Sequence, residues 1–177
     1  MDLLTISPGS HPSTLRLMNV ASLIALHAAI YWKRYLRRVR PSEVLPALLP
    51  PISVPGHASF PSGHATQARL IARCVKSILP FTDAQGTVQD VLAAVQPGLD
   101  ALAFRIARNR EIAGLHYPSD SEGGRILADN IFDNILAKDP MDPTEQSVDK
   151  VIGVVTTYKL KSKYQVIKEA AMAEWLR

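Results

Sequence analysis

The chain has 177 residues, of which 47% are hydrophobic and 20% charged, and its formal net charge is +4 at pH 7. These proportions exclude an intrinsically disordered chain and a fibrous repeat, and the length fits one domain with at most a small appendage. A single cysteine, Cys74, excludes an intrachain disulfide and a cysteine-rich metal site.

No secretory signal is visible at the start of the chain, and no stretch reaches about 18 uninterrupted apolar residues. We therefore expect a soluble protein without a transmembrane span. Its compartment stays open: cytoplasmic or, if this is a processed chain, periplasmic.

Hydrophobic periodicity predicts four main helices in the first 140 residues, over 14–39, 62–79, 98–114 and 118–138. In the first, Leu23, Leu26 and Ile30 recur at helical spacing with Val20 and Ile24 beside them, which predicts a mostly buried helix. The pattern also repeats over residues 88–95, and Pro97 then either kinks one long helix or begins a new one.

Residues 41–61 hold six prolines and one glycine, which predicts an ordered loop. A loop of about twenty residues is uncommon in a compact domain unless it serves a site. Beyond residue 140, the segment VIGVVTTY favours a strand, and residues 165–176 favour a terminal helix.

The predicted fold class is therefore all-α: an antiparallel helical bundle with a long Pro-rich active-site loop. A short β-hairpin or an irregular segment is expected near residues 150–163. Residues 1–140 form the expected helical catalytic domain, and residues 141–177 an extension packed on it or on a neighbouring subunit. The apolar stripe on residues 15–30 is too broad for a lone four-helix domain, so we expect a homo-oligomer.

Positive charge is concentrated in the first half of the chain. Residues 1–80 carry a net charge of +7 and residues 81–177 a net charge of −3, and five cations lie between Lys33 and Arg40. Such an octet fits a solvated helix end, favoured by the helix dipole, or a site for phosphate, nucleic acid or an acidic membrane.

Lys33 and Arg40 lie seven residues apart, which places them on about one face of a helix. A lysine and an arginine are the usual pair for holding a phosphate-like oxyanion. For Arg34, Arg37 and Arg38 we expect ordinary surface charge.

Ser62, Gly63 and His64 lie where the loop becomes a helix. The first amides of a helix have no internal partners, and glycine lets an anion approach the backbone, so an anion site is one interpretation. The same residues also form an ordinary capping sequence.

His116 and Asp120 are spaced i, i+4, so the carboxylate can reach one ring nitrogen and leave the other free. The pair fits an oriented nucleophile, a metal ligand or a structural hydrogen bond. His27, inside an apolar helix, is expected to be a core or interface histidine, and we assign no role to His57 in the loop.

Three segments in this order, KRYLRRVRP, PSGH and NREIAGLHYPSD, resemble the signature of the type 2 phosphatidic acid phosphatase superfamily. The superfamily includes bacterial non-specific acid phosphatases and vanadium-dependent haloperoxidases. Its pattern is K-x6-RP, PSGH and SR-x5-H-x3-D, and Asn109 stands where the family has a serine peripheral to the chemistry. The resemblance covers about residues 30–135, and PSGHATQA is particularly similar to the soluble haloperoxidase branch.

The resemblance implies that Lys33, Arg40 and Arg110 hold the oxygens of a phosphate, aided by Ser62 and the amide of Gly63. It implies no resident metal, because fixed cations take the place of magnesium.

The resemblance also implies the catalytic roles. His116 attacks phosphorus and forms a phosphohistidine, Asp120 orients its ring, and His64 protonates the leaving oxygen and then activates water.

The expected function is a metal-independent phosphatase for a small phosphorylated substrate, with no required cofactor. One alternative is a haloperoxidase, in which His116 binds vanadium in vanadate and hydrogen peroxide oxidises halide. An alternative from another class is a non-enzymatic binder of a polyanion or a membrane surface, although we expect no nucleic acid partner.

These roles place a demand on the fold. The clusters are separated by 20 residues, from Pro41 to Pro61, and by 46 residues, from His64 to Arg110, yet they must meet around one anion. An antiparallel bundle brings all three to one end. Gly123 and Gly124, each costly in a helix, predict a second helix packed closely against that turn.

Overall fold

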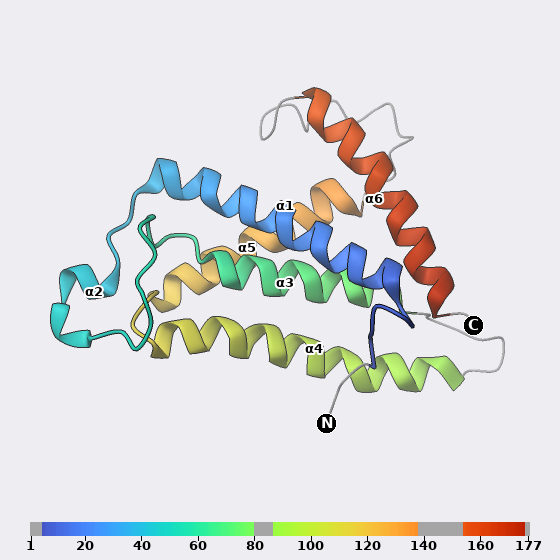
Figure 1. Ribbon diagram of the computed structural model, residues 1–177, viewed down its shortest axis with the longest axis horizontal. Helices are drawn as coiled ribbons and strands as arrows, with labels where there is room; N and C mark the ends of the chain where they lie inside the picture. Colours follow the sequence, from blue (N-terminus) through green and yellow to red (C-terminus); the bar gives the residue numbers. More distant parts are fainter. Residues whose placement is uncertain (1–4, 80–86, 138–153, 176–177) are drawn as a thin grey trace.

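The computed structural model describes residues 5–79, 87–137 and 154–175, and these residues form a helical bundle (Figure 1). Its elements, in chain order, are α1 (Pro12–Leu36), α2 (Pro41–Val44), η1 (Pro46–Leu48), α3 (Gly63–Lys76), α4 (Thr87–Ile112), α5 (Pro118–Ile131), η2 (Phe132–Leu136) and α6 (Val154–Glu174). Within these ranges there is no strand, so the all-α prediction is confirmed. The helices α1, α3, α4 and α5 alternate in direction (Figure 1).

Helix α1 buries a different face from the one that the sequence pattern indicated. Its buried side chains recur at four-residue intervals: Leu17, Ala21, Ala25, Ala29 and Lys33. Leu23, Leu26 and Ile30 are exposed, so the prediction that this face is buried was wrong for the single chain. The alanines are the buried residues because their small side chains let α1 lie close to α3, its main packing partner. The homo-oligomer that would cover the outer face stays a prediction.

The end of the first helix differs from expectation, and at Pro97 the structure follows one of the two predicted alternatives. The first helix ends at Leu36, where Arg37 takes a left-handed conformation (φ 43°), so Arg40 lies beyond the helix. Pro97 lies inside α4, which is one helix from Thr87 to Ile112. His27 is exposed on α1 rather than part of the core.

The end of the chain is helical where a strand or irregular segment was predicted. Helix α6 begins at Val154 and covers most of residues 150–163; residues 150–153 lie outside the described residues. The boundary predicted at residue 140 also lies outside them, so the division into domain and extension stays a prediction.

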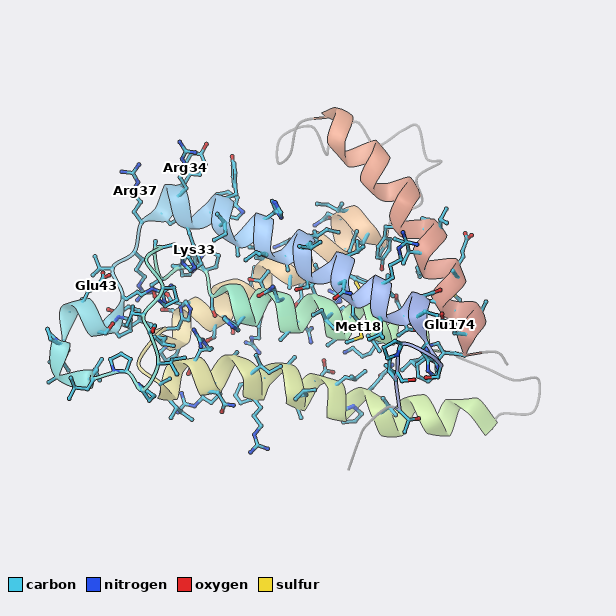
Figure 2. The ribbon with its side chains drawn as sticks, in the orientation of Figure 1. Met18, Lys33, Arg34, Arg37, Glu43 and Glu174 are labelled. Carbon is cyan, nitrogen blue, oxygen red and sulfur yellow. The ribbon has the colours of Figure 1, made fainter. Side chains whose placement is uncertain are left out.

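Helix α6 is fastened to the start of α1. The Glu174 carboxylate accepts hydrogen bonds from the backbone N–H groups of Ser13 (2.6 Å) and Thr14 (2.9 Å), which have no partner inside their own helix (Figure 2). Trp175 adds a hydrogen bond from its ring N–H to the Thr14 hydroxyl. Tyr164, which precedes Glu174 on α6, is buried in the main core beside Cys74.

By length and composition alone, one described helix, within Pro12–Val44, is long and apolar enough to cross a membrane. This is weak evidence, because the core helix of a soluble protein passes the same test. The expectation that the chain has no transmembrane span therefore stays a prediction.

Gly123 and Gly124 mark a close crossing between α5 and the segment that enters α3. A Cβ atom on Gly124 would lie 2.6 Å from the Ser62 carbonyl oxygen and 2.9 Å from the Ala65 Cβ, while one on Gly123 would overlap the Phe60 ring. The expected close approach at this turn is thus present, and it brings the start of α3 against the first turns of α5.

Gly124→Ala should lower the free energy of unfolding by about 1–3 kcal/mol, because the added methyl group meets backbone that has no room to move. Urea unfolding followed by circular dichroism measures the change. Gly56→Ala is the control: open space surrounds Gly56, and we expect a change within about 0.5 kcal/mol. A Gly124→Ala variant as stable as the parent would contradict the close packing.

Candidate functional site

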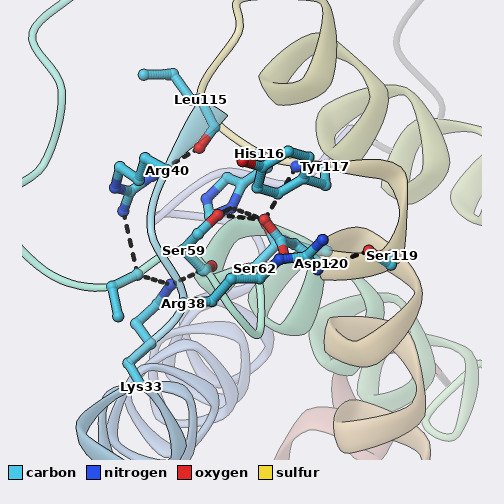
Figure 3. Close-up of polar contacts among 12 residues, drawn as sticks. Lys33, Arg38, Arg40, Ser59, Ser62, Leu115, His116, Tyr117, Ser119 and Asp120 are labelled. Carbon is cyan, nitrogen blue, oxygen red and sulfur yellow. Dashed lines mark hydrogen bonds and ion pairs between the residues drawn. The ribbon is translucent and has the colours of Figure 1, made fainter. Parts of the chain in front are cut away.

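The three sequence clusters meet at one end of the bundle, formed by the end of α1, the start of α3 and the junction between α4 and α5 (Figures 1 and 3). Lys33 Nζ donates to the carbonyl oxygens of Ala58 and Ser59, both at 2.7 Å. Arg40 Nη1 donates to the carbonyl oxygen of Leu115 at 2.8 Å, next to His116. The Pro-rich loop is therefore held between the other two segments.

The backbone at the start of α3 also contacts the junction between α4 and α5. Ser62 N–H donates to the Asp120 carbonyl oxygen at 2.9 Å, and the Ser62 hydroxyl accepts from the Ala65 amide as the N-cap of α3. Gly63 is the first residue of the helix. The capping interpretation of this cluster is thus correct, and an additional role in anion binding stays a prediction.

Lys33 and Arg40 are buried cations whose direct partners are neutral. Lys33 is 3% exposed and Arg40 1%, and their hydrogen bonds go to backbone carbonyl groups and to His57 Nδ1. Neither forms an ion pair within the described residues. Burial and the nearby Arg40 charge lower the pKa of Lys33 to about 8. Positive charge is therefore held here without a matching carboxylate, which favours an anion.

Arg110 and His64 contribute from the other two segments. Arg110, in the last turn of α4, buries its Nε–H without an acceptor among the described residues. His64 reaches the surface, and partial burial together with the positive charges of Arg110 and Lys33 lowers its pKa. A buried donor with no partner beside a cluster of positive charge suits an oxyanion acceptor.

His116 is oriented by Asp120, as the i, i+4 spacing predicts. Its Nδ1 lies 3.1 Å from Asp120 Oδ2, and both side chains are buried (Figure 3). An ionised carboxylate only accepts hydrogen bonds, so Nδ1 carries the proton and Nε2 keeps its lone pair. Burial lowers the pKa of His116 despite this hydrogen bond, which favours the neutral ring.

Asp120 receives two further contacts that the sequence analysis missed or misassigned. Ser59, fully buried, donates its hydroxyl to Asp120 Oδ2 and lies 3.4 Å from His116 Nδ1. Arg38, expected to be surface charge, instead pairs with Asp120 Oδ1 at 2.9 Å and stacks over the Tyr117 ring. Arg34 and Arg37 do point away from the bundle (Figure 2).

The sequence analysis failed to predict the Asp120 contacts of Ser59 and Arg38 for the same reason. Arg38 follows the left-handed residue that ends α1, so helical periodicity no longer describes where its side chain points. The path of the loop determines the position of Ser59, and the Ser59 N–H donates to the Arg38 carbonyl oxygen at 2.8 Å. No residue pattern marks either position.

The environment of Asp120 stabilises its ionised form. Burial alone would raise the pKa of this carboxyl, but hydrogen bonds from His116, Ser59 and the Tyr117 amide (2.9 Å) hold it below its ordinary value. A carboxyl with a lower pKa in the folded chain than in the unfolded chain stabilises the fold above its unfolded pKa. This contribution is lost as the pH falls through the folded pKa.

Ser59→Ala should therefore lower the free energy of unfolding at pH 7 by about 1–3 kcal/mol, because a buried carboxylate loses a donor. The difference should shrink in acid, as the pH falls through the lowered pKa of Asp120 and the carboxyl becomes protonated. Urea unfolding at pH 7 and at a series of lower pH values measures it. Ser119→Ala, which removes only an exposed acceptor for Arg38, is the matched control. Equal effects of the two substitutions would remove Ser59 from the network.

No protein-family model matches the chain. The chain is similar to the vanadium-dependent bromoperoxidase of Ascophyllum nodosum: it is 28% identical over 109 residues, which are 52% of this chain and 20% of that protein. It thus spans about a fifth of the length of that relative. This distant similarity agrees with the motif resemblance at the level of the phosphatidic acid phosphatase and haloperoxidase superfamily, and no finer.

Proposed function

We propose that the protein is a metal-independent phosphatase that hydrolyses phosphate monoesters through a phosphohistidine intermediate. The observation that carries the proposal is the neutral, buried His116, held by Asp120 among the cations Lys33, Arg40 and Arg110. Phosphoryl transfer asks a protein mainly for positioning and charge stabilisation. This cluster offers both.

In the first step, His116 Nε2 forms a bond to phosphorus while the bond to the leaving oxygen breaks. The leaving oxygen takes the electron pair and a proton from His64. Lys33, Arg40 and Arg110 bind the phosphoryl oxygens, whose charge increases in the transition state. Ser62 and the Gly63 amide complete this binding set.

In the second step, neutral His64 takes a proton from a water molecule. The water oxygen attacks phosphorus, the phosphorus–nitrogen bond breaks, and phosphate leaves His116 free. Among the described residues, no group of three or more His, Cys, Asp or Glu side chains could hold a metal ion. The proposal accordingly assigns charge stabilisation to the fixed cations.

The protonation states set the pH range. The lowered pKa of His116 keeps the nucleophile neutral to a lower pH than an ordinary histidine, whereas His64 must carry a proton to act as an acid. Because the pKa of His64 is also lowered, its protonated fraction increases as the pH falls below neutrality. We therefore expect kcat/KM to be highest in mildly acidic solution.

The similarity to a bromoperoxidase favours a second candidate function, vanadium-dependent halide oxidation. Vanadate has the shape and charge of phosphate, and the orphaned Arg110 Nε–H and buried Lys33 and Arg40 suit either oxyanion. His116 Nε2 would supply the bond to vanadium. Bound vanadate would provide the activation of hydrogen peroxide for halide oxidation.

One preparation assayed twice separates the two functions. Phosphate release from an aryl phosphate tests the phosphatase, and halide oxidation by peroxide after loading with vanadate tests the haloperoxidase. Halide oxidation without phosphate release would reverse the order of the two candidates. Absence of both would contradict the enzymatic proposal and favour the non-enzymatic binder.

His116→Ala should abolish phosphate release, because the variant has no nucleophile. Asp120→Asn should retain a small residual activity, since the ring keeps its nitrogen but loses its orientation and tautomer. Steady-state kinetics measures both. Arg105→Gln, an exposed change on α4, is the control and should leave kcat and KM unchanged. Full activity in purified His116→Ala would refute the mechanism.

Vanadate should inhibit phosphate release in competition with substrate, because it adopts the five-coordinate geometry of the transition state. A chelator added before the assay should leave the rate unchanged. Initial rates at several substrate concentrations distinguish competitive from mixed inhibition. Loss of most activity in the chelator, restored by a divalent cation, would identify a metallophosphatase instead.

A further inference from the structure

Beyond the candidate site, the end of the bundle exposes an unusually apolar surface. We call residues 44–54 the end cap; they form η1 and its flanks at the extreme end of the molecule (Figure 1). Six of its large apolar side chains are exposed: Val44, Leu45, Leu48, Leu49, Ile52 and Val54. Leu49 is 80% exposed, and no charged residue occurs from Val44 to Gly56.

The backbone of the end cap is suited to leaving water. The N–H groups of Leu45, Leu48 and Leu49 donate to carbonyl groups within residues 41–46. Prolines at positions 46, 50, 51 and 55 have no N–H to satisfy. Moving this segment into an apolar phase therefore leaves few backbone donors without a partner, which is the main cost of such a transfer.

Two exposed cations occur at the same end of the bundle. Arg34, in the last turn of α1, and Arg37, the residue that follows this helix, project outward (Figure 2). Tyr35, Leu36 and Val39, neighbours of these arginines in the sequence, are also exposed. From Lys33 to His64 the chain holds one acid, Glu43, and, apart from the buried Lys33 and Arg40 and the Asp120-paired Arg38, the two cations Arg34 and Arg37.

We propose that the end cap and the last turn of α1 dock on the surface of an anionic lipid bilayer. The leucines enter the boundary of the acyl chains, and Arg34 and Arg37 contact the lipid phosphates. Exposed apolar residues flanked by an aromatic residue and by cations are the usual composition of such a contact. The proposal uses none of Lys33, Arg40 and Arg110, which we call the anion cluster, and does not depend on the catalytic function.

Charge decides between a bilayer and other partners. In a symmetric contact with a second copy, the arginines would be buried against the same patch of the other chain, which offers a single acid, Glu43, for two arginines. Nucleic acid would satisfy the arginines but offers no apolar phase for Leu45 and Leu49. An anionic bilayer supplies both complements at one surface.

Co-sedimentation with vesicles tests the proposal. The protein should bind vesicles of mixed phosphatidylserine and phosphatidylcholine more tightly than pure phosphatidylcholine, and added salt should weaken the binding. Inorganic phosphate at constant ionic strength should leave binding unchanged. Displacement by phosphate would assign the lipid contact to the Lys33, Arg40 and Arg110 cluster and overturn the proposal.

Matched variants locate the contact. Leu49→Asn should weaken binding about tenfold, and asparagine tolerates the left-handed conformation of this residue (φ 41°). Arg34→Gln and Arg37→Gln should each weaken it about fivefold. Leu23→Asn and Arg105→Gln, exposed positions on α1 and α4, are the controls and should leave binding unchanged.

Three further results would overturn the proposal. One is equal binding to neutral and anionic vesicles, or none to either. Another is a loss of binding in Leu23→Asn as large as in Leu49→Asn, which would move the contact to the outer face of α1. Sedimentation velocity adds a third arm: a dimer that only Leu49→Asn dissociates would assign the end cap to a second copy.

Discussion

The candidate site depends on one buried carboxylate, that of Asp120. It accepts hydrogen bonds from His116, Ser59 and the Tyr117 amide and an ion pair from Arg38. These donors come from the segment after α1, the Pro-rich loop and the junction of α4 and α5. A single ionised side chain thus fixes the relative positions of the segments and also sets the tautomer of the histidine, so the same interaction serves stability and chemistry.

The charge balance around this carboxylate is unequal. Asp120 has its own cation, Arg38, whereas Lys33 and Arg40 are buried against carbonyl groups, and the Arg110 Nε–H has no partner among the residues that the structure describes. Burying cations without counter-ions costs free energy, which an anion would recover on binding. We therefore propose that an oxyanion bound among these cations stabilises the fold. Both the phosphatase and the haloperoxidase proposals draw on this property.

The packing of α1 places its two ends in different environments. Its alanine stripe lies against α3, so its larger apolar side chains face outward, and its first turn is fastened to α6 by Glu174. The last turn carries Lys33 inward and Arg34 and Arg37 outward (Figure 2). Lys33 thus belongs to the anion cluster, whereas Arg34 and Arg37, one and four residues further along the chain, belong to the proposed docking surface.

The sequence by itself determined the helical class, because apolar periodicity and proline positions are local properties. It also indicated which residues, Lys33, Arg40, Arg110 and His116 among them, should meet, through spacing that resembles a known signature. Only the tertiary structure decided that Ser59 and Arg38 reach Asp120, that alanines rather than Leu23 and Ile30 face the core, and that Val154 begins a helix. These outcomes depend on how closely two helices approach and where a loop passes after a left-handed residue, and such contacts between distant segments leave no periodic trace in the chain.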